Sequence, residues 1–191
     1  PTASKTETSA EHHQPTRPNN QPGGSTFNRR QGVHFQSALT ETKIPGFKVA
    51  IGGDGEFARD LHMLERSGAP IRMLGRLEGR RKALAMAASS LLVVPEWVGL
   101  VAVDSLAAGL PLVTTAHWSH APEFEYFVNG ANCLVTPHSI ADYSQHIVEL
   151  LLDEDRLQSM RIRARQDSKG LSAEAIAKNF AAGIVSWTRQ G

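Results

Sequence analysis

Two carboxylates that flank a helix start are the residues whose types and spacing best suit ligand chemistry in this sequence. Glu96 comes soon after the apolar run Leu91–Val94, and Asp104 follows with seven residues between them, about one turn into a predicted helix. The amides at such a helix start, here from Gly99 onward, favour an anion such as a diphosphate. A carboxylate accepts several hydrogen bonds and suits the paired hydroxyls of a ribose or a hexose. Asp104 could instead serve only the helix dipole, but that alternative leaves Glu96 unexplained.

A glycine-rich turn is the second candidate for ligand binding. Gly53, Asp54 and Gly55 follow the apolar run Lys48–Gly52 and precede a predicted helix. Glycines at a strand-to-helix turn let the backbone approach a phosphate. The turn matches neither the Gly-Lys-Ser/Thr phosphate loop nor the dinucleotide pattern G-x-G-x-x-G. Because glycine turns of this kind are common, this one gives only weak support for a ligand site by itself.

Alternating short strands and helices must position these residues. We expect strands at Lys48–Gly52, Ile71–Leu74, Leu91–Val94, Leu112–Thr115 and Cys133–Thr136. We expect helices at Phe57–Arg66, Arg80–Ala88, Leu100–Ala108, Ile140–Leu152, Arg156–Arg165 and Ala173–Trp187. This alternation predicts an α/β fold with a Rossmann-like parallel sheet and helices on both faces. Ligands of such sheets bind at the carboxyl ends of the strands, which is where Glu96 lies.

Composition separates a polar leader from a folding domain. Residues 1–24 are rich in Pro, Ser, Thr, Asn, Gln and Gly, so we expect a disordered leader or linker there and a single domain over residues 25–191. Lys plus Arg total 20 against 19 acidic residues, a net charge of +1, which gives no electrostatic case for nucleic-acid binding. The basic cluster Arg161–Arg165 is better explained as a solvated helix face.

The single cysteine and the apolar segments bear on location. Cys133 is the only cysteine, which excludes an internal disulfide framework and fits a reducing compartment. Its apolar surroundings in the sequence predict a small buried side chain rather than a reactive thiol. Prolines and carboxylates interrupt the apolar stretch Leu91–Val113, so we predict no transmembrane segment. We expect a cytoplasmic protein, either free or peripheral to the inner face of a membrane.

The run around Glu96 and Asp104 resembles the signature of a known enzyme family. Its order is proline, Glu96, Gly-Leu-Val, Asp104, then Gly-Leu-Pro-Leu-Val, similar to P-S-x-x-E-G-F-G-L-V-x-x-E-A-M-A-x-G-x-P-V-V. That signature belongs to the C-terminal, donor-binding domain of the retaining GT-B glycosyltransferases of group 1. Three further segments resemble family segments: Pro45–Gly55, Met73–Arg76 and Glu125–Val135.

The resemblance implies a donor site for a nucleotide sugar such as a UDP-, GDP- or ADP-sugar, with no cofactor and no metal ion. It implies that Glu96 is the catalytic residue and holds hydroxyls of the donor sugar, while Asp104 holds the ribose. The full set of donor-binding residues that it implies is Arg30, Gln31, Gly53, Asp54, Gly55, Gly75, Arg76, Gly99, Leu100, Val101 and Asp104. The diphosphate would lie near Gly53, Arg30 and the helix-start amides, where leaving-group charge is stabilised.

Several positions depart from the family pattern. Gln31 stands where the family has a lysine, which removes a charge from the diphosphate clamp, and the spacing of Arg30 differs. Asp104 replaces a glutamate and has a shorter arm toward the ribose. Trp97 makes the loop between strand and helix bulkier. These departures indicate either an unusual donor or a weakened site.

Three other features have simpler explanations than ligand binding. The segment Gly75–Lys82 copies the family's clamp but follows the Gly-Asp-Gly turn instead of preceding it, so we expect a basic helix start. The acidic run Asp153–Asp155 is similar to a D-x-D metal motif but joins two predicted helices, which indicates a solvated turn. His117 and His120 have no further ligand at metal-binding spacing, so we interpret them as loop residues.

The length accommodates only one of the two domains of a GT-B enzyme. The family binds its acceptor mainly on the N-terminal domain, which the resemblance places outside this sequence. We therefore expect the donor-binding half of a glycosyltransferase, with an exposed apolar face that favours a partner domain or a homo-oligomer. One alternative is a non-catalytic nucleotide-sugar-binding or interaction module. Another is an unrelated flavodoxin-like or epimerase-type nucleotide domain, which would not require Glu96 and Asp104 at this spacing.

Overall fold

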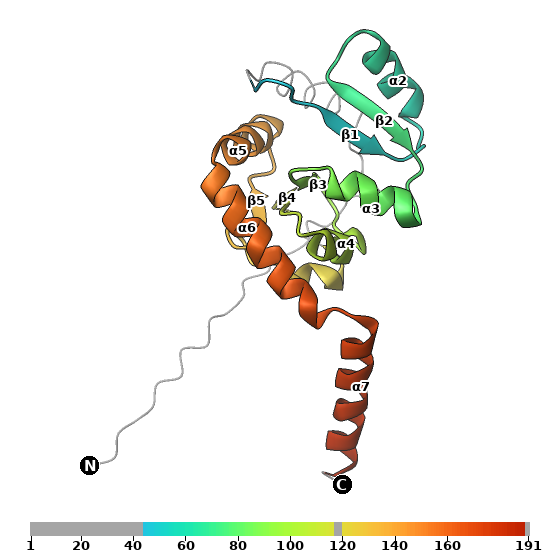
Figure 1. The fold of residues 1–191 in the computed structure, drawn as a ribbon, viewed down its shortest axis with the longest axis vertical. Helices are drawn as coiled ribbons and strands as arrows, with labels where there is room; N and C mark the ends of the chain where they lie inside the picture. The colour runs from blue at the N-terminus through green and yellow to red at the C-terminus, as the bar shows by residue number, and fades with distance from the viewer. Residues whose placement is uncertain (1–43, 117–119, 190–191) are drawn as a thin grey trace, which may run out of the picture.

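The computed structural model describes residues 44–116 and 120–189, which form an α/β fold of parallel strands and helices (Figure 1). Its strands are β1 (Val49–Gly52), β2 (Ile71–Gly75), β3 (Leu92–Val93), β4 (Leu112–Thr115) and β5 (Cys133–Thr136). The α-helices are α2 (Ala58–Arg66), α3 (Gly79–Ala87), α4 (Val101–Ala108), α5 (Ile140–Leu152), α6 (Glu154–Asp167) and α7 (Ala173–Thr188). Two short 3-10 helices are η1 (Pro122–Tyr126) and η2 (Ser168–Gly170). The fold class expected from the sequence is confirmed, whereas the expected leader lies outside the described residues.

The strands fall into two hydrogen-bonded groups. β1 and β2 pair in parallel, with Val49 opposite Ile71, and α2 connects them. β3, β4 and β5 form a second parallel sheet in that order, with Leu92 opposite Leu112 and Leu112 opposite Cys133. Within the described residues the two groups share no strand pairing. The carboxyl ends of β3, β4 and β5 therefore meet along one edge, because their strands are parallel.

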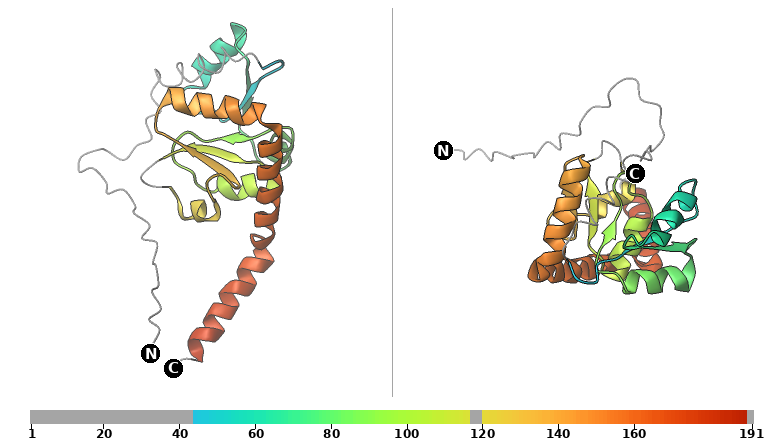
Figure 2. Two further views of the ribbon diagram at one scale, coloured as in Figure 1. Left: turned by 90° about the vertical axis from the view of Figure 1, so that its left-hand side faces the viewer. Right: turned by 90° about the horizontal axis from the view of Figure 1, so that it is seen from above.

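Successive residues of a strand point to opposite faces of the sheet, so the apolar strands of the second sheet have two apolar faces. Helices cover both of these faces. Val113 and Leu134 pack against a cluster supplied by α5 and α6, which includes Tyr143, Ile147 and Met160. Leu112 and Cys133 pack on the other face, in a cluster with Val98 and with Ala102 of α4. Figure 2 shows α5 lying along one side of these strands.

Cys133 belongs to this core, as expected. It is 1% exposed, and burial raises the pKa of its thiol to about 12. The thiolate is the reactive form of cysteine, so burial disfavours reaction at the Cys133 thiol.

The last two helices begin where side chains cap them. α6 starts two residues earlier than expected because the Asp153 side chain accepts a hydrogen bond from the Arg156 amide at 3.0 Å. The Ser172 hydroxyl accepts from the Ala175 amide at 3.1 Å at the start of α7. α7 projects away from the other described elements (Figure 1). No helix in the described part of the chain combines the length and apolar character needed to cross a membrane.

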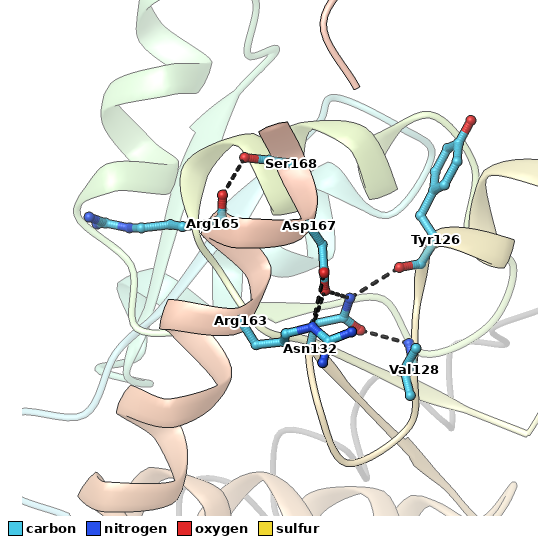
Figure 3. A network of polar contacts seen from close by, with 7 residues as sticks. All are labelled: Tyr126, Val128, Asn132, Arg163, Arg165, Asp167 and Ser168. Atoms are coloured by element: carbon cyan, nitrogen blue, oxygen red, sulfur yellow. Dashed lines mark hydrogen bonds and ion pairs between the residues drawn. The ribbon is translucent and has the colours of Figure 1, made fainter. Parts of the chain in front are cut away.

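A buried asparagine ties α6 to the turn before β5 (Figure 3). The Asn132 side chain is fully buried, accepts from the Val128 amide at 2.7 Å and donates to the Tyr126 carbonyl at 3.1 Å. It also donates to the Asp167 carboxylate at 2.7 Å, and Arg163 donates to the same carboxylate from one turn earlier in α6. This network fixes the C-terminal end of α6 against the turn that leads into β5.

Candidate functional site

The connection from β3 to α4 is held against β4 by two threonines. Thr114 donates its hydroxyl to the Glu96 carbonyl oxygen at 3.2 Å. Thr115 donates its hydroxyl to the Pro95 carbonyl oxygen. Both threonines are buried, so the backbone on either side of the Pro95–Glu96 peptide is fixed at the carboxyl end of the sheet. Glu96 lies at this edge, which is the position predicted from the sequence, and its side chain is half-buried.

Trp97 and Gly99 shape the next part of the loop. A side chain at Gly99 would meet the Trp97 indole at 2.6 Å, so the glycine leaves the space that the ring occupies. Gly99 is therefore buried beneath Trp97, which itself is 55% exposed. The Val98 amide donates to Nδ1 of His120 at 3.2 Å, and the His120 ring stacks on Phe124 with centroids 4.0 Å apart. His120 thus stabilises this loop from the segment before η1, in agreement with its interpretation as a loop residue.

The start of α4 presents backbone amides next to this loop. The amides of Ala102 and Val103 donate to the carbonyls of Gly99 and Leu100 within the first turn. An α-helix leaves its first amides without partners inside the helix, and the positive end of its dipole lies there. Leu100 is 73% exposed, whereas Gly99 is covered by Trp97. Of the residues at this helix start, Leu100 is exposed and Val101 is partly exposed, whereas Gly99 is buried.

Asp104 forms an ion pair that the sequence did not reveal. Nζ of Lys82 lies 2.8 Å from Oδ2 of Asp104, and the side chains are 39% and 34% exposed. Each is the fourth residue of its helix, Lys82 in α3 and Asp104 in α4. The first turns of the two helices therefore lie side by side, and a cation stands beside the carboxylate predicted to bind a ribose. Lys82 belongs to the segment interpreted from the sequence as a basic helix start, and α3 does begin there.

The glycine turns after β1 and β2 lie next to each other. The Gly53 amide donates to the Gly75 carbonyl at 2.8 Å. Both glycines have positive φ, 134° at Gly53 and 63° at Gly75, which side chains of other residues rarely tolerate. Asp54 and Gly55 are exposed at this turn, and Arg76 pairs with Glu78 at 2.6 Å on the surface. These turns mark the carboxyl edge of the first strand pair.

The predicted site residues thus form two groups linked by α3. One group is Gly53 with Gly75 and their neighbours, and the other is Glu96 with the start of α4. α3 follows the Gly75 turn directly and brings Lys82 to Asp104, so it connects the two groups. Arg30 and Gln31 lie outside the described residues, and so does His117. Asp153–Asp155 is exposed where α5 meets α6, as expected of a solvated turn.

Sequence patterns do not reveal the contact of Lys82 with Asp104 or the buried threonines Thr114 and Thr115, although Lys82 lies in the clamp-like segment Gly75–Lys82 that is interpreted above as a basic helix start. Their partners lie 18 to 22 residues away in sequence, so no local spacing pattern connects them. The described residues contain no group of three or more His, Cys, Asp or Glu side chains arranged to hold a metal ion.

Comparison with known proteins gives a family and a fold. The family model for "Glycosyl transferases group 1" matches residues 26–167. No curated protein matches the sequence.

Solved structures match over most of this chain. HepE from Anabaena, solved in complex with UDP, is 21% identical with a TM-score of 0.63, and the match covers 81% of this chain and 44% of HepE. Sucrose-phosphate synthase from Thermosynechococcus elongatus is 20% identical with a TM-score of 0.65, over 86% of this chain and 44% of that enzyme. The pneumococcal O-GlcNAc transferase GtfA, solved with UDP and GlcNAc, is 16% identical with a TM-score of 0.61, over 83% of this chain and 33% of GtfA. This chain therefore corresponds to less than half the length of each, and the likeness establishes its fold.

Proposed function

Since the chain belongs to the group 1 family of glycosyl transferases, we propose that it is the donor-binding part of an enzyme that transfers a hexose from a nucleoside diphosphate sugar, with retention of configuration. The observation that carries this proposal is the grouping of Glu96, the start of α4 and the Asp104–Lys82 pair at the carboxyl edge of β3. This edge is where parallel α/β sheets bind ligands.

Each group has a role that follows from its chemistry. Glu96 accepts hydrogen bonds from hydroxyls of the donor sugar and is the catalytic residue of the proposal. Asp104 accepts hydrogen bonds from the ribose hydroxyls, because a carboxylate suits a pair of neighbouring hydroxyls. The amides of Leu100 and Val101 and the turns at Gly53–Gly55 and Gly75–Arg76 complete the donor site.

The diphosphate leaving group needs positive charge nearby. During transfer, the bond between the anomeric carbon and the diphosphate oxygen breaks, and the hydroxyl oxygen of the acceptor bonds to the same face of that carbon. Negative charge develops on the departing diphosphate, which takes up the proton of the acceptor hydroxyl. The Lys82 ammonium group, which pairs with Asp104, and the amides at the start of α4 are proposed to stabilise that charge. Lys82 supplies a charge that Gln31 does not, while Arg30 is proposed to join the site from outside the described residues. The proposed chemistry needs neither a metal ion nor a dedicated base.

We also propose how the domains of the protein are organised and where in the cell it acts. The domain begins near residue 25, close to the start of the family match at residue 26. An acceptor-binding domain supplies the other substrate, since this chain spans 44% of HepE and of sucrose-phosphate synthase. A cytoplasmic location suits a chain whose single cysteine is buried and unpaired. The same partial coverage supports a second candidate function, a non-catalytic module that binds a nucleotide sugar.

Calorimetric titration tests the donor site that both candidate functions require. UDP is the first ligand to test, because the HepE and GtfA structures contain it, followed by GDP, ADP and their sugars. We expect one nucleotide and its sugar to bind, and no heat with any of them at millimolar concentration would contradict a donor site.

Glu96→Gln tests the catalytic role. It removes the carboxylate charge but keeps the size of the side chain, so we expect binding to persist and turnover of the nucleotide sugar to be lost. Glu149→Gln is the matched control, since it makes the same change at an exposed carboxylate of α5 that contacts Gln145. Turnover of the sugar nucleotide by wild type but not by Glu96→Gln supports an enzyme. Undiminished turnover by Glu96→Gln would contradict the catalytic role of Glu96. Binding without turnover by the wild-type chain fits a donor-binding half that awaits its acceptor domain, whereas turnover that stays absent after an acceptor domain is supplied supports the non-catalytic module.

A further inference from the structure

An exposed histidine at the end of β5 shares the carboxyl edge with Glu96. His138 lies two residues beyond β5, and its Nδ1 is 3.2 Å from the buried Thr115 hydroxyl at the end of β4. The Thr115 hydroxyl in turn contacts the Pro95 carbonyl oxygen, next to Glu96. A line of hydrogen bonds therefore crosses all three strand ends, from His138 through Thr115 to the loop that carries Glu96.

Counting protons along this line fixes the tautomer of the ring. The Pro95 carbonyl can only accept, so the single hydroxyl proton of Thr115 is donated to it. The proton between Thr115 and His138 must then come from the ring, which makes Nδ1 of His138 the donor. In the neutral imidazole only one nitrogen carries a proton. Nε2 of His138 is therefore a hydrogen-bond acceptor on an exposed side chain.

The backbone around His138 holds the ring in place. The Ser139 amide donates to the Pro137 carbonyl at 2.9 Å, which closes a tight turn centred on His138. The Thr136 hydroxyl also donates to the Pro137 carbonyl, and Ser139 caps α5 by accepting from the Asp142 amide. A ring anchored at Nδ1 on a fixed turn loses little conformational freedom when a ligand binds at Nε2.

The spacing across the sheet suits one sugar. Neighbouring strands are about 4.8 Å apart, so the ends of β3 and β5 are separated by about 10 Å. Glu96 follows β3 and His138 follows β5, with the end of β4 between them. Residues this far apart on one edge are close enough for their side chains to contact the same hexose ring.

We propose that His138 is a further donor-binding residue whose Nε2 accepts a hydrogen bond from a hydroxyl of the donor sugar. The inference rests on the proposed function, because it assumes that the sugar of a nucleotide sugar lies at this edge. It adds a specificity-determining contact on the β5 side of the sugar, opposite Glu96. Loss of this contact should weaken binding of the sugar nucleotide without affecting the free nucleotide.

Two substitutions separate a ligand contact from a structural one. In His138→Asn, the shorter amide can still donate to Thr115 in place of Nδ1 but has no group at the position of Nε2. In His138→Gln, the longer amide can place its oxygen near the position of Nε2. His146→Asn is the matched control, because Nδ1 of His146 contacts the Asp142 carbonyl oxygen within α5. Each variant and the wild-type chain are titrated with UDP and with UDP-glucose.

We expect His138→Asn to bind UDP-glucose about 3- to 10-fold more weakly than wild type, the loss typical of one hydrogen bond. Its affinity for UDP should be unchanged, His138→Gln should recover part of the UDP-glucose affinity, and His146→Asn should match wild type. Wild-type affinity of His138→Asn for UDP-glucose would overturn the inference. Equal weakening toward both ligands would also overturn it, by showing that His138 only supports the loop. If the wild-type chain binds neither ligand, the proposed function fails together with this inference.

Discussion

The two strand groups differ sharply in how well they are packed. Around the second sheet, α4, α5 and α6 bury side chains such as Leu106, Leu112, Leu150 and Met160 to 1% exposure or less. In the unit of β1, α2 and β2, Ile71 is the one apolar side chain of the described residues that is buried, and α2 buries none. The proposed donor site draws residues from both. The sugar side of the proposed site therefore lies on the well-packed second sheet, while the turns at Gly53 and Gly75 lie on the loosely packed pair of β1 and β2.

The largest expected effect comes from the core of the well-packed region. Leu150→Ala removes a fully buried side chain from the cluster between α5 and β4, and we expect it to lower the free energy of unfolding by about 2–5 kcal/mol. Leu152, two residues further along α5, is 66% exposed, so Leu152→Ala should change it by less than about 0.5 kcal/mol. Met63→Ala in α2, where Met63 is 53% exposed, should resemble Leu152→Ala. Urea denaturation measures all three, and equal losses would refute the contrast between the regions.

Asn132→Ala tests the polar attachment of α6 to the same region. The substitution leaves the Val128 amide, the Tyr126 carbonyl and the Asp167 carboxylate without the partner that they share (Figure 3). We expect a loss of roughly 2–3 kcal/mol in the free energy of unfolding, because three hydrogen bonds of a fully buried side chain are lost at about 1 kcal/mol each. Arg163→Ala is the control. It removes only the exposed pair with Asp167 and should cost less than about 1 kcal/mol. A harmless Asn132→Ala variant would show that packing alone holds α6.

Because Cys133 is buried in the second sheet, its thiol should make the free energy of unfolding depend on pH. The pKa of its thiol is raised from 9.0 to about 12, so the folded state keeps the proton over a range where the unfolded state loses it. Stability from this group is fully present below pH 9 and decreases as the pH rises from 9 toward 12, by on the order of 1 kcal/mol per pH unit. Cys133→Ala should flatten this part of a stability profile measured by chemical denaturation. An unchanged slope in the variant would rule out the thiol as its cause.

Lys82→Met tests the link between the two regions and has the smallest effect on stability. The half-exposed ion pair with Asp104 should contribute less than about 1 kcal/mol to folding. Binding of UDP should weaken about 3- to 10-fold, because hydrogen bonds and ion contacts to a charged group contribute about that much. Lys82→Arg keeps the charge and should bind better than Lys82→Met in the same calorimetric titration. Tighter binding by Lys82→Met would show instead that the lysine competes with the ligand for Asp104.

The sequence predicted the elements well because their signals are local. Short runs next to a proline, such as Leu112–Thr115 after Pro111 and Cys133–Thr136 before Pro137, form strands with the expected bounds. The burial of Cys133 and the helix start before Asp104 followed from equally short patterns. Small differences arose at helix ends, where a single cap such as Asp153 decides the boundary.

Contacts between distant residues could not be predicted from such patterns. The pairing of Lys82 with Asp104 depends on two helices starting side by side, and the line from His138 to Pro95 depends on the order of three strands. The position of the Trp97 ring over Gly99 depends on packing rather than on residue type. The sequence alone therefore indicated which residues could bind a donor, but not which neighbours would support them.

Amide hydrogen exchange with and without UDP-glucose is the sharpest test of the proposed donor site. We expect slower exchange in the presence of the ligand at the start of α4, around Leu100 and Val101, and in the turns at Gly53–Gly55 and Gly75–Arg76. Exchange along α6 and in the body of α5, far from the strand ends, should not change. Protection confined to other surfaces, or no protection at saturating UDP-glucose, would contradict a donor site at the carboxyl edge of the strands.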